Sequence, residues 1–174
     1  MATVILRPTS TTTETGWTVF NMHTVLGDND ASTGGLQNNT FCNFTGVLAD
    51  LESGLSGATI NNFTISLTGK AGRAGAATVA MSLVHLSDGA FASEDESFGG
   101  ITTTETTSAR TTQQDGSSHL SYSYINNCSV RIVPNNQGIT AYELFVTVDF
   151  TPGAAGKINI QNGKIELKEG RISF

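Results

Sequence analysis

The sequence is poor in charged residues, aromatic residues, proline and cysteine. Only 14% of its 174 residues are charged and 7% are aromatic, and it has three prolines and two cysteines. An average soluble domain carries roughly 25% charged residues, so the polar surface must come from Thr, Ser, Asn, Gln and the 19 glycines. This composition favours strands and turns over helices.

Basic residues are scarce as well: nine Lys and Arg stand against 15 Asp and Glu, for a net charge of −6. Nucleic-acid binding needs clustered Lys and Arg for the phosphates, so that class of partner is excluded. No apolar run is long enough to span a bilayer, and residues 1–13, MATVILRPTSTTT, lack the apolar core of a secretory signal. We therefore expect synthesis in a cytoplasm and no membrane partner.

The cysteines, Cys42 and Cys128, are far apart in the sequence. In a reducing compartment, buried thiols are the favoured interpretation. A disulfide between two strands is the alternative, and the sequence leaves it open.

Residues 141–150, AYELFVTVDF, carry the clearest strand pattern. One side of the extended chain would hold the apolar set Tyr142, Leu144, Val146, Val148 and Phe150. Residues 130–133 alternate in the same way, and residues 134–138, PNNQG, have the composition of a turn. The two runs are predicted to be neighbouring strands in the core of a β-sandwich.

Similar short runs recur along the chain and predict an all-β protein with at most one or two helical turns. Residues 47–55 fit a short helix or a bent strand equally well. The three histidines have no Ser or Cys motif beside them, and no pair of carboxylates can be placed at a catalytic separation. The sequence therefore predicts that the protein is not an enzyme, with a hydrolase as the third-ranked function.

Three segments resemble motifs of the discoidin-like galactose-binding β-sandwich, which is also known from coagulation-factor type C domains. They are residues 28–33 (DNDAST), residues 49–51 with 60–65 (ADL and INNFTI), and residues 129–132 with 143–146 (SVRI and ELFV). The resemblance implies a jelly-roll β-sandwich of antiparallel sheets over residues 1–151.

In that family the Asp-rich loop and a late glutamate commonly hold a structural calcium ion. The implied ligands here are Asp28, Asp30, Thr33 and Glu143, whose hard oxygens suit this ion. Asn29 replaces the usual glycine of the loop, and the aromatic residue that normally follows the loop is missing. An Asx-rich turn without a metal is the alternative.

The low charge and the Thr-, Ser- and Gly-rich strands also resemble virion proteins of tailed bacteriophages. This resemblance implies a structural virion protein, either a capsid decoration protein or a tail-associated adaptor, whose partners are other virion proteins. Its expected location is the virion, after synthesis in the host cytoplasm. The alternative function is a carbohydrate-binding module that recognises host surface glycans through loops at one end of the sandwich.

The last residues are predicted to form an assembly element. Residues 152–156, PGAAG, read as a linker, and residues 157–174 as a three-stranded β-meander with turns at Asn162-Gly163 and Glu169-Gly170. Pairing across these turns would put six apolar residues on one face: Ile158, Ile160, Ile165, Leu167, Ile172 and Phe174. We expect this face to pack in a homo-oligomer, with a trimer favoured, or on a neighbouring virion protein. Packing against its own sandwich is the alternative.

Overall fold

The computed structural model describes most strands of the chain and two short helices. The residues it describes are 2–18, 21–28, 34–36, 43–49, 51, 55, 57–72, 77–85, 96–102, 104, 106–112, 121–134, 138–153, 158–161 and 164–167.

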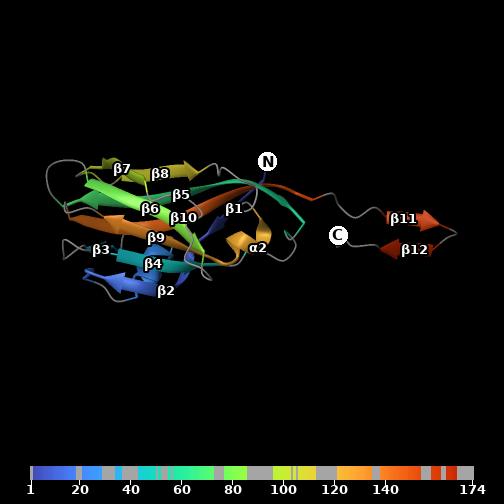
Figure 1. Ribbon diagram of the computed structural model, residues 1–174, viewed down its shortest axis with the longest axis horizontal. Coiled ribbons are helices and arrows are strands. Elements are labelled where there is room, and N and C mark those ends of the chain that lie inside the picture. The colour runs from blue at the N-terminus through green and yellow to red at the C-terminus, as the bar shows by residue number, and fades with distance from the viewer. Residues whose placement is uncertain are drawn as a thin grey trace.

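Two antiparallel sheets pack face to face (Figure 1). The first, called the β10 sheet, has the order β1 (Ala2–Leu6), β10 (Ile139–Thr151), β5 (Thr59–Ala71) and β8 (Thr106–Thr112), with the short strand β3 (Gly35–Leu36) also paired to β10. The second, called the β9 sheet, has the order β2 (Pro8–Thr15), β4 (Asn43–Leu48), β9 (Cys128–Pro134), β6 (Ala77–His85) and β7 (Glu96–Ile101). The predicted all-β sandwich is confirmed.

The strand order is that of a jelly roll. Early strands pair with late ones in a nested series: β1 with β10, β4 with β9, β5 with β8, and β6 with β7. Successive pairs alternate between the two sheets, as in a long hairpin rolled up on itself. The chain therefore closes its core by contacts between residues far apart in the sequence.

The core lies between the sheets and is built from the inward residues of each strand. Its largest fully buried side chains include Phe44 on β4, Phe63 on β5 and Met81 on β6. Trp17 is also buried, and its indole Nε1 donates a hydrogen bond to the carbonyl oxygen of Asn43 at 3.2 Å. The single tryptophan thus packs in the core while its polar atom is satisfied.

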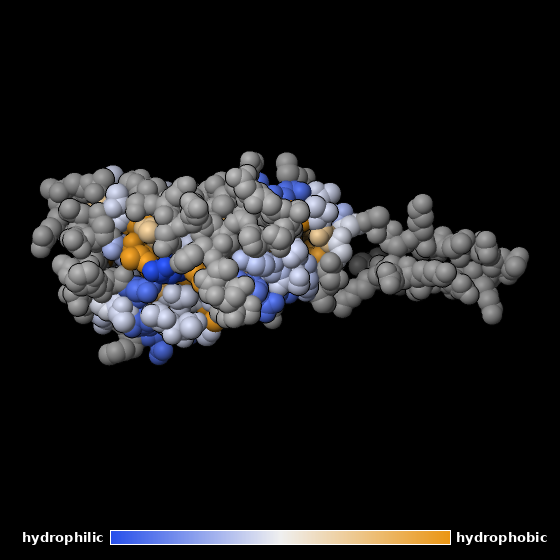
Figure 2. Space-filling view, in the orientation of Figure 1, coloured by the Kyte–Doolittle hydropathy of each residue, from blue (hydrophilic) through white to orange (hydrophobic). Residues whose placement is uncertain are grey.

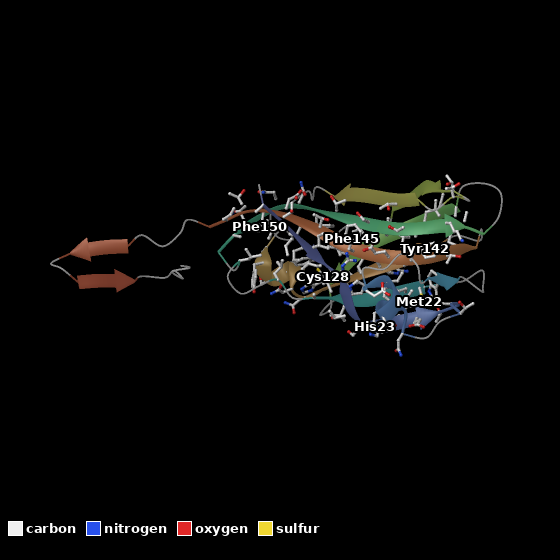
Figure 3. All side chains as sticks on the ribbon, turned by 180° about the vertical axis from the view of Figure 1, so that it is seen from behind. Met22, His23, Cys128, Tyr142, Phe145 and Phe150 are labelled. Carbon is white, nitrogen blue, oxygen red and sulfur yellow. The ribbon has the colours of Figure 1, made fainter. Side chains whose placement is uncertain are left out.

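Strand β10 follows the predicted alternation along most of its length. Leu144, Val146 and Val148 are fully buried, and Figure 3 shows Tyr142, Phe145 and Phe150 spaced along the strand. The pairing with β5 shifts between Ala141 and Glu143, so Tyr142 is the extra residue of a β-bulge. Tyr142 is buried but does not belong to the core cluster, which corrects its predicted place beside Leu144.

The prediction that residues 130–133 and 141–150 form neighbouring strands is wrong. The first run lies in β9, which pairs with β4 and β6, and the second lies in β10, which pairs with β1, β3 and β5. The intervening segment crosses from one sheet to the other, so the two strands contribute to opposite walls of the core.

The helices of the described residues are about one turn each, as predicted. Helix α1 (Met22–Leu26) buries Met22 and Leu26, and the backbone N–H of Met22 donates to the carboxylate of Glu14 at 2.9 Å. Helix α2 (Tyr122–Ile125) begins at Ser121, whose hydroxyl accepts a hydrogen bond from the backbone N–H of Tyr124 at 3.2 Å. Strand β4 ends at Leu48, so among the described residues of the segment 47–55 the first two are strand.

Beyond β10 the chain forms the hairpin β11 (Ile158–Gln161) and β12 (Lys164–Leu167), which lies past the end of the sandwich (Figure 1). Its register is the predicted one, with Ile158 opposite Leu167 and Ile160 opposite Ile165. The third strand predicted for the meander, with Ile172 and Phe174, lies outside the described residues. The division of the chain at residues 152–156 stays a prediction.

Candidate functional site

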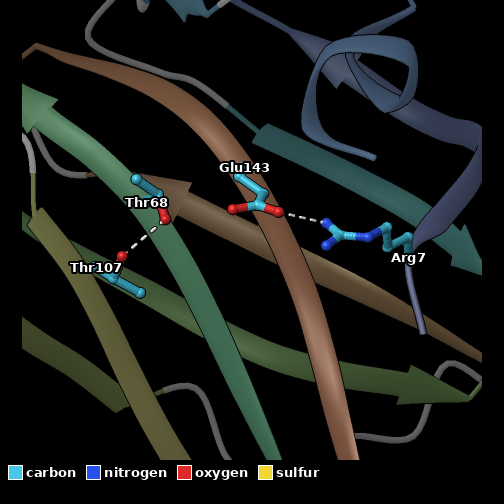
Figure 4. A network of polar contacts seen from close by, with 4 residues as sticks. All are labelled: Arg7, Thr68, Thr107 and Glu143. Atoms are coloured by element: carbon cyan, nitrogen blue, oxygen red, sulfur yellow. Dashed lines mark hydrogen bonds and ion pairs between the residues drawn. The ribbon is translucent and has the colours of Figure 1, made fainter. Parts of the chain in front are cut away.

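Glu143 carries the clearest polar contact of the described residues. Its carboxylate Oε1 accepts a hydrogen bond from Nη1 of Arg7 at 2.7 Å, forming an ion pair across 136 positions of the sequence (Figure 4). The side chain of Glu143 is only 17% exposed, and that of Arg7 is 22% exposed. Both groups are largely shielded from water, and the hydrogen bond between them is charge-assisted.

The ion pair fills a gap along one edge of β10. On this edge β1 pairs as far as Leu6, which lies opposite Val146, and β3 pairs with β10 at Thr140 and Ala141. Residues 142–145 lie between these two partners. Arg7 is the first residue after β1 and reaches across that interval to Glu143, so it links the corner of the sandwich to β10.

The backbone and an aromatic ring also hold Arg7. Its carbonyl oxygen accepts a hydrogen bond from the N–H of Ala49 at 2.9 Å, just after β4 ends. The guanidinium carbon lies 5.3 Å from the centroid of the Phe145 ring, within the range of a cation–π contact. A second cation, the amino group of Lys70, lies 5.7 Å from the ring of Tyr142. Two cation–aromatic contacts therefore flank Glu143 along β10.

Short hydroxyl side chains continue the site across the sheet. Glu143 lies opposite Thr68 on β5, and Thr68 lies opposite Thr107 on β8. The two threonine hydroxyls are 2.9 Å apart (Figure 4). Two polar pairs, Arg7 with Glu143 and Thr68 with Thr107, thus lie in one row across the sheet.

The predicted calcium ligands are only partly described. Asp30 and Thr33 lie outside the described residues, and Asp28 is exposed at the end of the α1 segment. Gly27, just before Asp28, lies so close to Pro8 that an added Cβ would be 2.6 Å from the Pro8 carbonyl oxygen. Asp28 therefore follows a residue that packs against Pro8, the neighbour of Arg7 in the chain.

The described half of this ligand set does not fit a calcium site. The carboxylate of Glu143 already has the Arg7 guanidinium as its cation. Within the described part of the chain, no three His, Cys, Asp or Glu side chains are grouped so that they could hold a metal ion. The calcium ion stays a prediction of the family resemblance.

Sequence reasoning identified Glu143 but missed Arg7. A weak signal is that the chain has only nine Lys and Arg, and a cation placed between two strands usually needs a charged partner. The spacing of 136 residues hides which carboxylate that partner is.

Two of the three histidines make contacts inside the fold. Nδ1 of His23 lies 2.8 Å from the hydroxyl of Thr11, and the ring of His85 stacks on Tyr124 with centroids 4.4 Å apart. Cys128 is buried, and its thiol donates to the carbonyl oxygen of Tyr124 at 3.2 Å (Figure 3). Cys42 lies outside the described residues.

The predicted assembly residues are described only in part. The backbone register of the hairpin pairs Ile158 with Leu167 and Ile160 with Ile165, while Ile172 and Phe174 lie outside the described residues. No helix in the described ranges is long and apolar enough to cross a membrane.

No protein-family model matches the chain. No curated protein matches it in sequence. Among solved structures, it is similar to the enzymatically active domain of tailspike protein 4 of bacteriophage CBA120, with a TM-score of 0.46 and 13% identity. The match covers 84% of this chain and 19% of the other, so the chain spans about a fifth of that protein's length.

The prediction that the protein is not an enzyme is contradicted by this match, because the matched domain is described as enzymatically active. That prediction is withdrawn. The likeness is distant and assigns no activity to this chain.

Proposed function

We propose that this protein is a virion component that joins its particle through the hairpin β11–β12. The observation that carries the proposal is the register of the hairpin, which aligns Ile158 with Leu167 and Ile160 with Ile165. Residues that alternate with these four, such as Asn159 and Glu166, are polar. The sequence and the register together predict a hairpin with one apolar face and one polar face.

A two-stranded hairpin is marginal by itself in water, so its apolar set needs a cover. Burying six such residues, counting Ile172 and Phe174, contributes on the order of 10 kcal/mol before ordering costs are subtracted. That amount is enough to drive association, and a closed arrangement around a symmetry axis would cover each copy equally. A trimer is the favoured state.

The described residues of the sandwich expose little apolar surface. Ile5, which is 53% exposed, is the large hydrophobic residue found at the surface of the described part of the chain. The face seen in Figure 2 shows orange atoms in small areas among white and blue ones. This supports the hairpin, and not the sandwich, as the element that associates.

The hairpin is joined to a fixed point of the sandwich. At the end of β10, the hydroxyl of Thr151 lies 3.1 Å from the side-chain nitrogen of Asn61. Two residues further on, Gly153 packs so closely on the backbone of Gly57 that an added Cβ would lie 2.4 Å from its carbonyl oxygen. The segment after β10, residues 152–174, is called the arm, and these contacts hold the chain to the sandwich where the arm begins.

The particle itself is inferred from the character of the sequence. The low charge and the Thr- and Ser-rich strands support a bacteriophage virion protein, as capsid decoration or tail-associated adaptor. The discoidin-like resemblance supports the same class of β-sandwich, and glycan binding through its loops stays a prediction.

The test is the mass of full-length variants measured by size-exclusion chromatography with light scattering. Ile165→Asp and Leu167→Asp should reduce an oligomer to a monomer, because each places a charge in the apolar set that the proposed association would bury. Glu166→Gln, on the other set of the same strand, is the matched control and should leave the mass unchanged. A truncation after Gly156 should also be monomeric. If both Asp variants keep the wild-type mass, the hairpin is not the assembly element.

A further inference from the structure

We infer that Arg7 is a built-in cation that takes the place of a metal ion beside Glu143. Family resemblance implies that Glu143 holds calcium, whereas its carboxylate contacts the Arg7 guanidinium at 2.7 Å. Of the other implied ligands, Asp28 is exposed, and Asp30 and Thr33 lie outside the described residues.

The position of Arg7 is fixed by its neighbours on both sides. Leu6 is locked into β1 by its pairing with Val146, and Pro8 begins β2 by pairing with Leu48. The Arg7 carbonyl oxygen is bonded to the N–H of Ala49. With its backbone held at the corner between the two sheets, Arg7 has little freedom except in its side chain.

The side chain in turn is directed by two contacts on β10. Glu143 binds the guanidinium at one nitrogen, and Phe145, two residues along the same strand, lies against it at 5.3 Å. The bulge at Tyr142 sets the orientation of Glu143 at this edge. The guanidinium is thus preorganised beside the carboxylate and loses little freedom when it binds.

A metal ion at the same carboxylate would have to compete with this arginine. Calcium sits at 2.3 to 2.6 Å from its oxygen ligands, roughly the distance at which the Arg7 nitrogen already lies. Two cations on one largely shielded carboxylate repel each other, and the arginine cannot lose its charge. The pair therefore ties the corner between β1 and β2 to β10, which is the structural task that a bound ion would perform.

The test compares melting temperatures in millimolar calcium chloride and in excess chelator. For the wild-type protein the two temperatures should agree. Arg7→Gln and Glu143→Gln should each lower the melting temperature by about 2 to 6 °C, because each leaves a shielded partner without its counterpart. The double variant should melt no lower than the worse single variant, because the two residues act as a unit.

Lys70→Gln is the matched control, since it removes another cation that lies over an aromatic ring of β10. The decrease in melting temperature that Lys70→Gln causes should add to the decrease caused by Glu143→Gln. Two results overturn the inference: a wild-type melting temperature that rises with calcium and no longer does so in Glu143→Gln, or additive effects of Arg7→Gln and Glu143→Gln. If Arg7→Gln does not fold, the calcium comparison on the wild type and on Arg7→Lys decides.

Discussion

The core residues of β10 show how well the alternation of apolar and polar residues predicts which side chains are buried. Leu144, Val146 and Val148 were expected to face inward and are fully buried. Tyr142 departs from the pattern because the bulge adds one residue to β10 relative to β5. A bulge depends on two strands at once, so the sequence of one strand does not reveal it.

At the residue scale, Phe63→Ala is expected to destabilise the sandwich strongly. Phe63 is fully buried on the central strand β5, and its loss leaves a cavity that the packed sheets cannot fill. The expected cost is about 3 to 5 kcal/mol in the free energy of unfolding, measured by urea denaturation. Ile5→Ala, at a site 53% exposed, is the comparison and should cost well under half as much. Equal losses would contradict the assignment of the core.

Candidate-site residues were predicted unevenly for a related reason. The acidic motif led to Glu143 through family resemblance, but its partner Arg7 lies 136 positions away. The two residues come together because β1, which ends just before Arg7, pairs with β10, which contains Glu143. A local motif shows the type of a side chain, whereas its partner follows from the topology.

Among the elements, turn chemistry was predicted more reliably than strand pairing. The Asn162-Gly163 dipeptide gave the register of β11 and β12, because a two-residue turn fixes both flanking strands. The segment 134–138 was expected to join neighbouring strands, yet it crosses between sheets. The composition of a loop indicates that the chain turns. It does not indicate which sheet the next strand joins.

Helix α2 offers an element-scale prediction about its N-cap. Ser121→Ala removes the hydroxyl that accepts a hydrogen bond from the Tyr124 N–H. The expected loss is about 1 kcal/mol in the free energy of unfolding. Ser10→Ala, at an exposed position on β2, is the control and should lie within about 0.5 kcal/mol of the wild type. Urea denaturation followed by circular dichroism measures both, and a Ser121→Ala variant as stable as the control would argue against the cap.

The contact between Gly153 and Gly57 gives a second prediction at this scale. A Cβ at Gly153 would lie 2.4 Å from the Gly57 carbonyl oxygen, whereas a Cβ at Gly57 would have no heavy atom within 4 Å. Gly153→Ala must therefore shift the start of the arm, and we expect a loss of about 1 to 3 kcal/mol in the free energy of unfolding. Gly57→Ala should have little effect. The reverse ranking of the two variants in thermal unfolding would show that the contact does not hold.

At the scale of the whole molecule, the nested pairing predicts slow folding. β1 must find β10, and β4 must find β9, before the core closes. Sandwiches dominated by such distant contacts fold in milliseconds to seconds. Stopped-flow fluorescence of Trp17, which is buried in the native state, should report refolding in that range or slower. Complete refolding within microseconds would be inconsistent with this topology.

The same pairing of β1 with β10 has a mechanical consequence. Ala2 lies opposite Phe150, so the start of the first strand and the base of the arm meet at one end of the sandwich. A load applied between these two points acts across the strands and opens their hydrogen bonds one after another, as in a zipper, instead of shearing them together. The sandwich would therefore yield at low force if its particle pulled on both points. It would resist better if the arm alone bore the tension and the first strand stayed slack.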